Sequence, residues 1–161
     1  MQGLEHGTMG EGGTATTDAP FDAQFIDGMI VHHQGAIVMA KQALERSSRP
    51  EIKALAQNIV TAQESEIARM REWRRGWFPD VPETQGTGME MGPMEVPEGD
   101  GPFDLRFIDA MIPHHEGAIA MAKEAQQKAA KTEIKQLAEE IIQAQMAEIA
   151  QMQQWRAAWF Q

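Results

Sequence analysis

Apolar side chains recur every three or four positions along most of the chain, which is the spacing of one face of an α-helix. The pattern predicts a first helix from about Ala19 to Ser47. Asp18 or Ala19 would cap this helix, and Pro20 would lie in its first turn, where proline is tolerated. The apolar face of the helix carries Phe25, Ile26, Met29, His33, Ala36, Ile37, Ala40 and Leu44.

A second helix follows almost at once. The segment 48–51 has the residue types of a capping box, and it predicts the start of a helix that reaches Trp77. Prolines soon after Trp77 would stop any extension. Two polar residues, Gln63 and Glu66, interrupt the otherwise apolar face of this second helix. The two helices together predict a helical hairpin.

The whole hairpin is repeated. Residues 18–78 align with residues 100–160 without a gap, and 34 of the 61 aligned positions are identical. The second copy predicts helices at about 101–130 and 132–159. Residues 79–99 contain Gly, Pro, Glu and Met without a periodic pattern, so we interpret them as a Met-rich linker. Two such hairpins need each other to bury a core, which predicts an all-α four-helix bundle over residues 18–160.

Composition narrows the functional classes. The chain has 161 residues, of which 42% are hydrophobic, and this is enough for one globular core. A net charge of −10 without a basic cluster argues against nucleic-acid binding, which needs cations to neutralise phosphates. The absence of cysteine excludes disulfides and thiolate metal sites. No apolar run has transmembrane length, and residues 1–17 are expected to form a disordered tail without the features of a signal peptide.

A histidine pair at the centre of each repeat carries the strongest chemical signal. The segment FIDGMIVHHQGAIVMAK (25–41) returns as FIDAMIPHHEGAIAMAK (107–123). Imidazole and thioether groups together suit soft or borderline metal ions, and copper above all. Helical geometry places Met29 and His33 one turn apart at the centre of the apolar face, while His32 and Met39 share one edge of it.

The hairpin also sets which residues lie level with the histidines. If the turn lies near residues 47–50, then Gln63, Glu66 and Met70 reach the same layer as Met29 and His33. A buried carboxylate needs a partner. A histidine N–H or a bound cation would serve, and Glu66 and Glu148 would then orient metal-binding histidines.

The candidate metal ligands of both copies are His32, His33, Met29, Met39, Met70, His114, His115, Met111, Met121 and Met152. Other interpretations stay open, because methionines on such faces often fill a core. Gln63 and Glu66 could also bond to each other across the hairpins. Two adjacent histidines are poorly explained by packing alone, since all their ring nitrogens need partners.

Further methionines lie outside the predicted helices. Met89, Met91 and Met94 fall within six residues of the linker, and His6 and Met9 lie in the tail. Flexible clusters of this kind could bind Cu(I) or Ag(I), or could form a hydrophobic contact surface.

The segment Met111-Ile112-Pro113-His114-His115-Glu116-Gly117-Ala118-Ile119-x-Met121-Ala122 resembles the signature of domain-of-unknown-function family 305. The Met-x-x-Trp sequence near the end of each copy fits that family as well. The resemblance covers both repeats. It implies a ferritin-like bundle, export from the bacterial cytoplasm, and copper bound by the histidine pairs and neighbouring methionines, as in members linked to copper resistance.

The two copies are not identical at the motif. The first copy has Gly28 and Val31 where the second has Ala110 and Pro113. Pro113 should bend the third helix just before His114, because proline removes a helical hydrogen bond. The two copies therefore need not bind metal equally.

These observations lead to one main hypothesis. We expect a periplasmic or extracellular protein, its signal peptide removed, that binds Cu(I), Ag(I) or Cu(II) for buffering, resistance or transfer. Its partners would be metal ions and another copper-handling protein, and it would not be an enzyme. One alternative is a ferritin-like di-metal oxidase or peroxidase, although no Glu precedes either histidine pair by three residues. The other is a structural bundle without metal.

Overall fold

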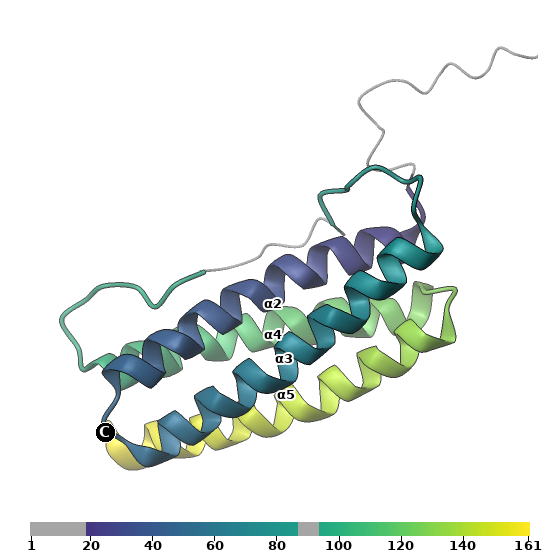
Figure 1. Cartoon of the computed structure of the whole chain (residues 1–161). Coiled ribbons are helices and arrows are strands. Elements are labelled where there is room, and N and C mark those ends of the chain that lie inside the picture. Colours follow the sequence, from purple (N-terminus) through teal and green to yellow (C-terminus); the bar gives the residue numbers. More distant parts are fainter. Residues whose placement is uncertain (1–18, 87–93) are drawn as a thin grey trace, which may run out of the picture.

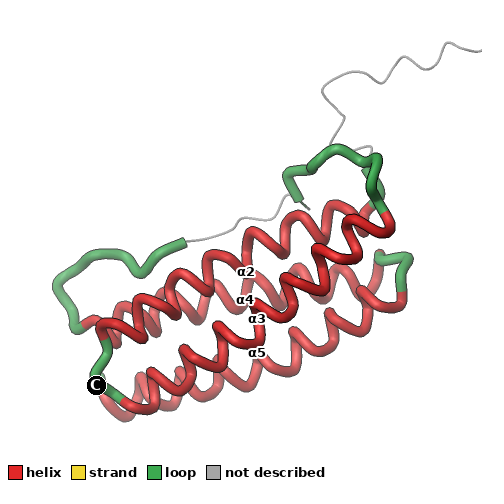
Figure 2. The backbone as a smooth tube through the Cα atoms, in the orientation of Figure 1, coloured by secondary structure: helices red, strands yellow, loops and turns green. Residues whose placement is uncertain are grey.

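A computed structural model describes residues 19–86 and 94–161, and the regular elements within these ranges are all helices. The helices are α2 (Phe21–Arg46), α3 (Pro50–Trp77), α4 (Phe103–Lys128) and α5 (Thr132–Trp159). They pack lengthwise as a four-helix bundle, and Figure 2 shows the loops gathered at its two ends. The predicted fold is confirmed, and the predicted helix ends agree with the observed ones to within two residues. The predicted tail, with His6 and Met9, and the linker residues Met89 and Met91 lie outside the described residues.

The two hairpins point in opposite directions, so that α2 and α4 are antiparallel (Figure 1). The Arg46 guanidinium at the end of α2 lies 4.6 Å from the ring centroid of Phe103 at the start of α4. Helix α3 therefore ends at one end of the bundle and α4 begins at the other. The connection between them spans the length of the bundle, and one long crossover of this kind is the ferritin-like connectivity.

The predicted helix caps are wrong in detail. Helix α3 has Arg49 as its N-cap and no side-chain capping bond, so the expected capping box at 48–51 is not formed. Helix α2 begins after Pro20, which is its N-cap in place of the expected Asp18 or Ala19. Local residue types suggested these caps, but none of the four described helices has a side-chain capping bond at its N-terminus.

A contact between the copies instead fixes the turn that leads into α5. The Asp22 carboxylate of α2 accepts hydrogen bonds from the backbone N–H groups of Ala130 (3.0 Å) and Lys131 (2.9 Å). The matching carboxylate of the second copy, Asp104, pairs instead with the Arg49 side chain at 3.2 Å. The first turn of α2 and that of α4 therefore each contact the turn between the helices of the other hairpin, although with different chemistry.

The core lies between the four helices and draws on both copies equally. Its largest fully buried side chains include two phenylalanines, several isoleucines and all six helical methionines named as candidate ligands: Met29, Met39, Met70, Met111, Met121 and Met152. Among the described helices, none has the length and apolar character needed to cross a membrane.

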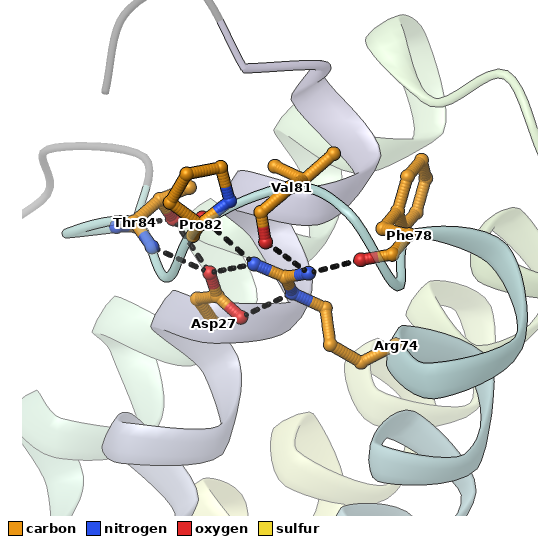
Figure 3. Close-up of polar contacts among 7 residues, drawn as sticks. Asp27, Arg74, Phe78, Val81, Pro82 and Thr84 are labelled. Carbon is orange, nitrogen blue, oxygen red and sulfur yellow. Dashed lines mark hydrogen bonds and ion pairs between the residues drawn. The ribbon is translucent and has the colours of Figure 1, made fainter. Parts of the chain in front are cut away.

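A polar clasp fixes the start of the connection after α3 (Figure 3). Asp27 on α2 accepts hydrogen bonds from the Arg74 guanidinium at 2.8 and 3.0 Å, and from the Thr84 N–H at 2.8 Å. Arg74 also donates to the backbone carbonyls of Phe78, Val81 and Pro82. Burial by itself would raise the pKa of Asp27, but the hydrogen bonds from Arg74 and Thr84 outweigh burial and hold that pKa below its usual value.

The clasp brings the connection into close contact with α2. Gly86 has a φ of 88°, and a Cβ atom there would lie only 2.8 Å from the Cα of Gly28. The first copy therefore has a glycine, the smallest residue, at the point on α2 where the connection crosses the helix. The second copy has Ala110 at the matching position. Its counterpart of the clasp, Asp109 with Arg156, is an exposed ion pair.

Candidate metal site

In each hairpin, a glutamate of the second helix holds one histidine of the pair. The Nε2 atom of His33 lies 2.6 Å from Oε1 of Glu66, and the Nε2 atom of His115 lies 2.6 Å from Oε1 of Glu148. Both rings are fully buried, whereas the carboxylates keep some contact with solvent. The prediction that Glu66 and Glu148 would pair with histidine is confirmed, and each bond lies within one hairpin rather than across the two.

These hydrogen bonds determine which nitrogen is free. A neutral ring that donates its Nε2–H to a carboxylate carries its lone pair on Nδ1. Among the described residues, the buried Nδ1 atoms of His33 and His115 have no hydrogen-bond partner. A carboxylate that orients an imidazole and makes it a better base is the usual partner of a metal-binding histidine. The arrangement of both rings therefore suits a metal ion at Nδ1.

The other histidine of each pair faces the opposite copy. The rings of His32 and His114 stack with their centroids 3.8 Å apart and their planes tilted by 34°. The sequence placed these residues at the edge of the apolar face. That edge is where α2 meets α4, so His32 and His114 are only 1% and 2% exposed. Within the described residues, the Nε2 atoms of both rings also have no hydrogen-bond partner. We call these two atoms, with Nδ1 of His33 and His115, the open nitrogens.

A glycine three residues after the first histidine of each pair makes this contact possible. A Cβ atom at Gly117 would lie 3.1 Å from Nε2 of His32, and one at Gly35 would lie 3.1 Å from Nε2 of His114. The same position at Gly35 is 2.6 Å from Sδ of Met94 in the connection. Sequence reasoning missed both glycines and the place of Met94. The repeated spacing His-His-x-Gly was the signal that could have revealed the glycines.

The environment keeps the stacked histidines neutral. Burial and the neighbouring histidines lower the pKa of His32 to about 4. Burial, followed by the charges of the other three histidines, lowers the pKa of His114 to about 2. Near pH 7 neither ring is protonated, so their nitrogen lone pairs are available to a ligand.

The candidate methionines share these four helices. Met29 and Met111 precede the inner histidines by one helical turn, and Met70 and Met152 follow the glutamates by one turn. In the described part of the chain, no three His, Asp or Glu side chains lie together as a ligand set for one ion. The neighbouring thioethers are therefore the candidates for further ligands of an ion at the open nitrogens. The role of the methionines as ligands stays a prediction, and so does the bend at Pro113, through which α4 continues.

A small polar cavity lies between α3 and α5. It has a volume of about 10 Å³, and Gln63, Glu66, Gln145 and Glu148 line it with four apolar residues. A volume of this size holds about one water molecule. Within residues 19–86 and 94–161, the Oε1 atoms of both buried glutamines have no partner. The cavity thus gives the two histidine-holding carboxylates a polar surrounding.

Comparison with known proteins agrees with this architecture. The family model described as a domain of unknown function (DUF305) matches residues 8–74 and 22–156. The structure of CopM in its Cu(II)-bound form is 40% identical to the chain, with a TM-score of 0.78, and the match covers 86% of this chain and 97% of CopM. CopM structures in Ag-bound and Cu(I)-bound forms match with TM-scores of 0.75 and 0.74.

Of two further matches, one is more distant in sequence and the other covers a shorter stretch of the chain. A DUF305 protein of Streptomyces coelicolor, a candidate secreted protein, is 25% identical over 86% of this chain and 92% of its own, with a TM-score of 0.71. The uncharacterized protein L153 of Acanthamoeba polyphaga mimivirus is 45% identical over 49 residues. That match spans 30% of this chain and 32% of the viral protein.

Proposed function

The chain belongs to the DUF305 family, and we propose that it binds copper ions through its buried histidines and methionines. The observation that carries this proposal is the set of four open nitrogens, all of them in a core that also contains six buried thioethers. Leaving a buried polar atom unpaired costs about 1–3 kcal/mol. A bound metal ion would remove this cost. The likeness to CopM, which is known in copper-bound and silver-bound forms, supports the same conclusion.

Cu(I) is the ion that we favour, with Ag(I) as its close analogue and Cu(II) as the alternative. Thioethers are soft ligands that select Cu(I), whereas Cu(II) prefers tetragonal sets of nitrogen and oxygen. The histidines occur in pairs, and the core around them also contains six buried thioether sulfur atoms. The apolar surroundings also favour an ion of low charge, because burying charge is costly.

We assign the ligand roles by position. His33 and His115 would bind through Nδ1, held in place by Glu66 and Glu148. His32 and His114 would bind through Nε2 at the contact between the copies. The thioethers that would complete the coordination are those of Met29, Met39, Met70, Met111, Met121 and Met152.

A protein of this kind would buffer copper, contribute to copper resistance, or pass the ion to another copper-handling protein. We propose that it acts in the periplasm or outside the cell, and the likeness to a candidate secreted protein of Streptomyces coelicolor supports this location. Nothing in the proposal requires catalysis.

A titration of the protein with Cu(I) against a competing chelator tests the proposal. The test variant replaces His32, His33, His114 and His115 with Ala. The control replaces His6, the one remaining histidine of the chain, with Ala. We expect tight binding that the fourfold variant loses and the control keeps. Circular dichroism checks that the variant is still helical, and a milder variant with only His33→Gln and His115→Gln serves if it is not. An unchanged affinity in a folded variant would show that these histidines are not the ligands.

A further inference from the structure

We infer that Met94 is a soft-metal ligand that works with His114, and that the connection between the hairpins thereby contributes to the binding site. The inference rests on the proposed copper binding and adds a residue from outside the helices. Met94 lies at the point where the connection reaches the contact between α2 and α4.

The positions of two donor atoms carry the inference. A Cβ atom at Gly35 would lie 2.6 Å from Sδ of Met94 and 3.1 Å from Nε2 of His114. The sulfur and the nitrogen therefore approach the same point on α2. Nε2 of His114 is one of the open nitrogens, and the ring is 2% exposed, whereas Met94 is 36% exposed. A partly exposed side chain thus places its sulfur close to a buried donor atom.

Met94 is held in this place by residues that follow it. Val96 is 3% exposed and packs in the core. Its backbone N–H donates a hydrogen bond of 2.9 Å to Oε1 of Gln42, which lies two turns beyond Gly35 on α2. The connection is therefore attached to the same helix that Met94 contacts, and the thioether is positioned rather than free on the surface.

Packing alone does not account for this methionine. A side chain that is more than a third exposed gains little from burial, and a leucine would gain as much. A thioether differs from leucine in its soft sulfur donor, and an adjacent imidazole nitrogen is the other donor that Cu(I) and Ag(I) accept. The lack of a side chain at Gly35 leaves room for both groups, because a Cβ atom at this position would clash with the sulfur.

The matching place in the other copy shows what Met94 adds. Within the described residues, the atoms that a Cβ at Gly117 would meet belong to His32 alone. Near Gly35 the open nitrogen of His114 therefore has a thioether close to it, whereas no thioether of the described residues lies at the matching place near Gly117 and His32. The residue that matches Gln42 is Glu124, an acid in place of an amide. The two halves of the bundle are thus unequal, and an ion from solvent would bind first at the Met94–His114 side.

The test uses Ag(I), which is not oxidised in air, and the full-length protein. The affinity for Ag(I) is measured by competition in the wild type, in Met94→Leu and in Met146→Leu. Met146 is 53% exposed on α5 and serves as the matched control. We expect Met94→Leu to weaken the tightest site by at least about tenfold, as loss of a supporting contact does at metal sites. Met146→Leu should leave the affinity unchanged.

A second readout separates a direct ligand from an indirect effect. In protein labelled with ¹³C at the methionine methyl groups, the Met94 signal should shift during the first equivalent of Ag(I). An unchanged affinity in Met94→Leu, or an unmoved Met94 signal, would overturn the inference while the proposed function stands. A wild-type protein that binds no Ag(I) and no Cu(I) would overturn both.

Discussion

The bond between His33 and Glu66 gives the sharpest prediction about stability. Replacing Glu66 with Leu removes the acceptor that lies 2.6 Å from a fully buried ring nitrogen. A hydrogen bond to a charged group contributes about 1.5–3 kcal/mol, and a buried donor without a partner costs a similar amount. We therefore expect the free energy of unfolding of the metal-free protein to fall by about 2–3 kcal/mol. Glu66→Gln keeps an oxygen acceptor for the ring and should lose less.

Urea denaturation followed by circular dichroism measures this change. The midpoint should move while the slope of the transition stays constant, because the mutation alters stability and not the surface exposed on unfolding. Glu64→Gln is the matched control, since Glu64 lies on the same helix in a long, exposed pair with Lys41 at 3.7 Å. If Glu66→Leu unfolds at the same urea concentration as the wild type, the hydrogen bond does not support the core and the reasoning about the free Nδ1 atom fails.

Three other predictions use the internal repeat or the buried histidines. Asp27→Ala should lower the free energy of unfolding by about 2–3 kcal/mol, because it leaves a largely buried Arg74 without its partner. Asp109→Ala, at the exposed counterpart, should change the urea midpoint little. Equal effects of the two substitutions would contradict this account of the clasp. Gly76→Ala should raise the melting temperature, because no atom lies within 4 Å of the new Cβ and Ala favours helix over Gly by about 1 kcal/mol. Gly117→Ala should raise it less, because the new Cβ would meet the His32 ring. An equal rise in both variants would refute the tight contact at Gly117. The pKa values of His32 and His114 are lowered to about 4 and about 2, so below about pH 6.5 the unfolded chain takes up protons that the folded protein does not. The contribution of the two neutral histidines to the free energy of unfolding is thus fully present above that pH and declines toward pH 4, by up to about 1.4 kcal/mol per pH unit for each histidine. Urea midpoints measured between pH 7 and pH 5 should decline less in His32→Asn than in the wild type. An equally steep decline in the variant would count against the buried neutral pair.

Much of the fold follows from the periodic pattern and its duplication. The spacing of apolar residues locates four helices, and a short turn near residue 48 brings Glu66 level with His33. That pairing needs only the geometry of one hairpin, which is local in sequence. The pairing of His115 with Glu148 could be predicted for the same reason.

Contacts between the two hairpins could not be predicted in this way. The stacking of His32 on His114 depends on the direction in which the second hairpin packs, and helical periodicity does not encode that direction. The hydrogen bonds that fix the turn before α5 were missed because their acceptor, Asp22, lies more than a hundred residues away in the sequence. Met94 was assigned to a loose linker cluster because the connection has no periodic pattern to locate it.

The most direct test of copper binding is a crystal soaked in Cu(I), with anomalous scattering used to place the ions. The account predicts copper at the open nitrogens of the histidines, with a methionine sulfur among the ligands of each ion and one ion between His114 and Met94. Copper found only at surface carboxylates, with the four histidines unchanged and without metal, would contradict it.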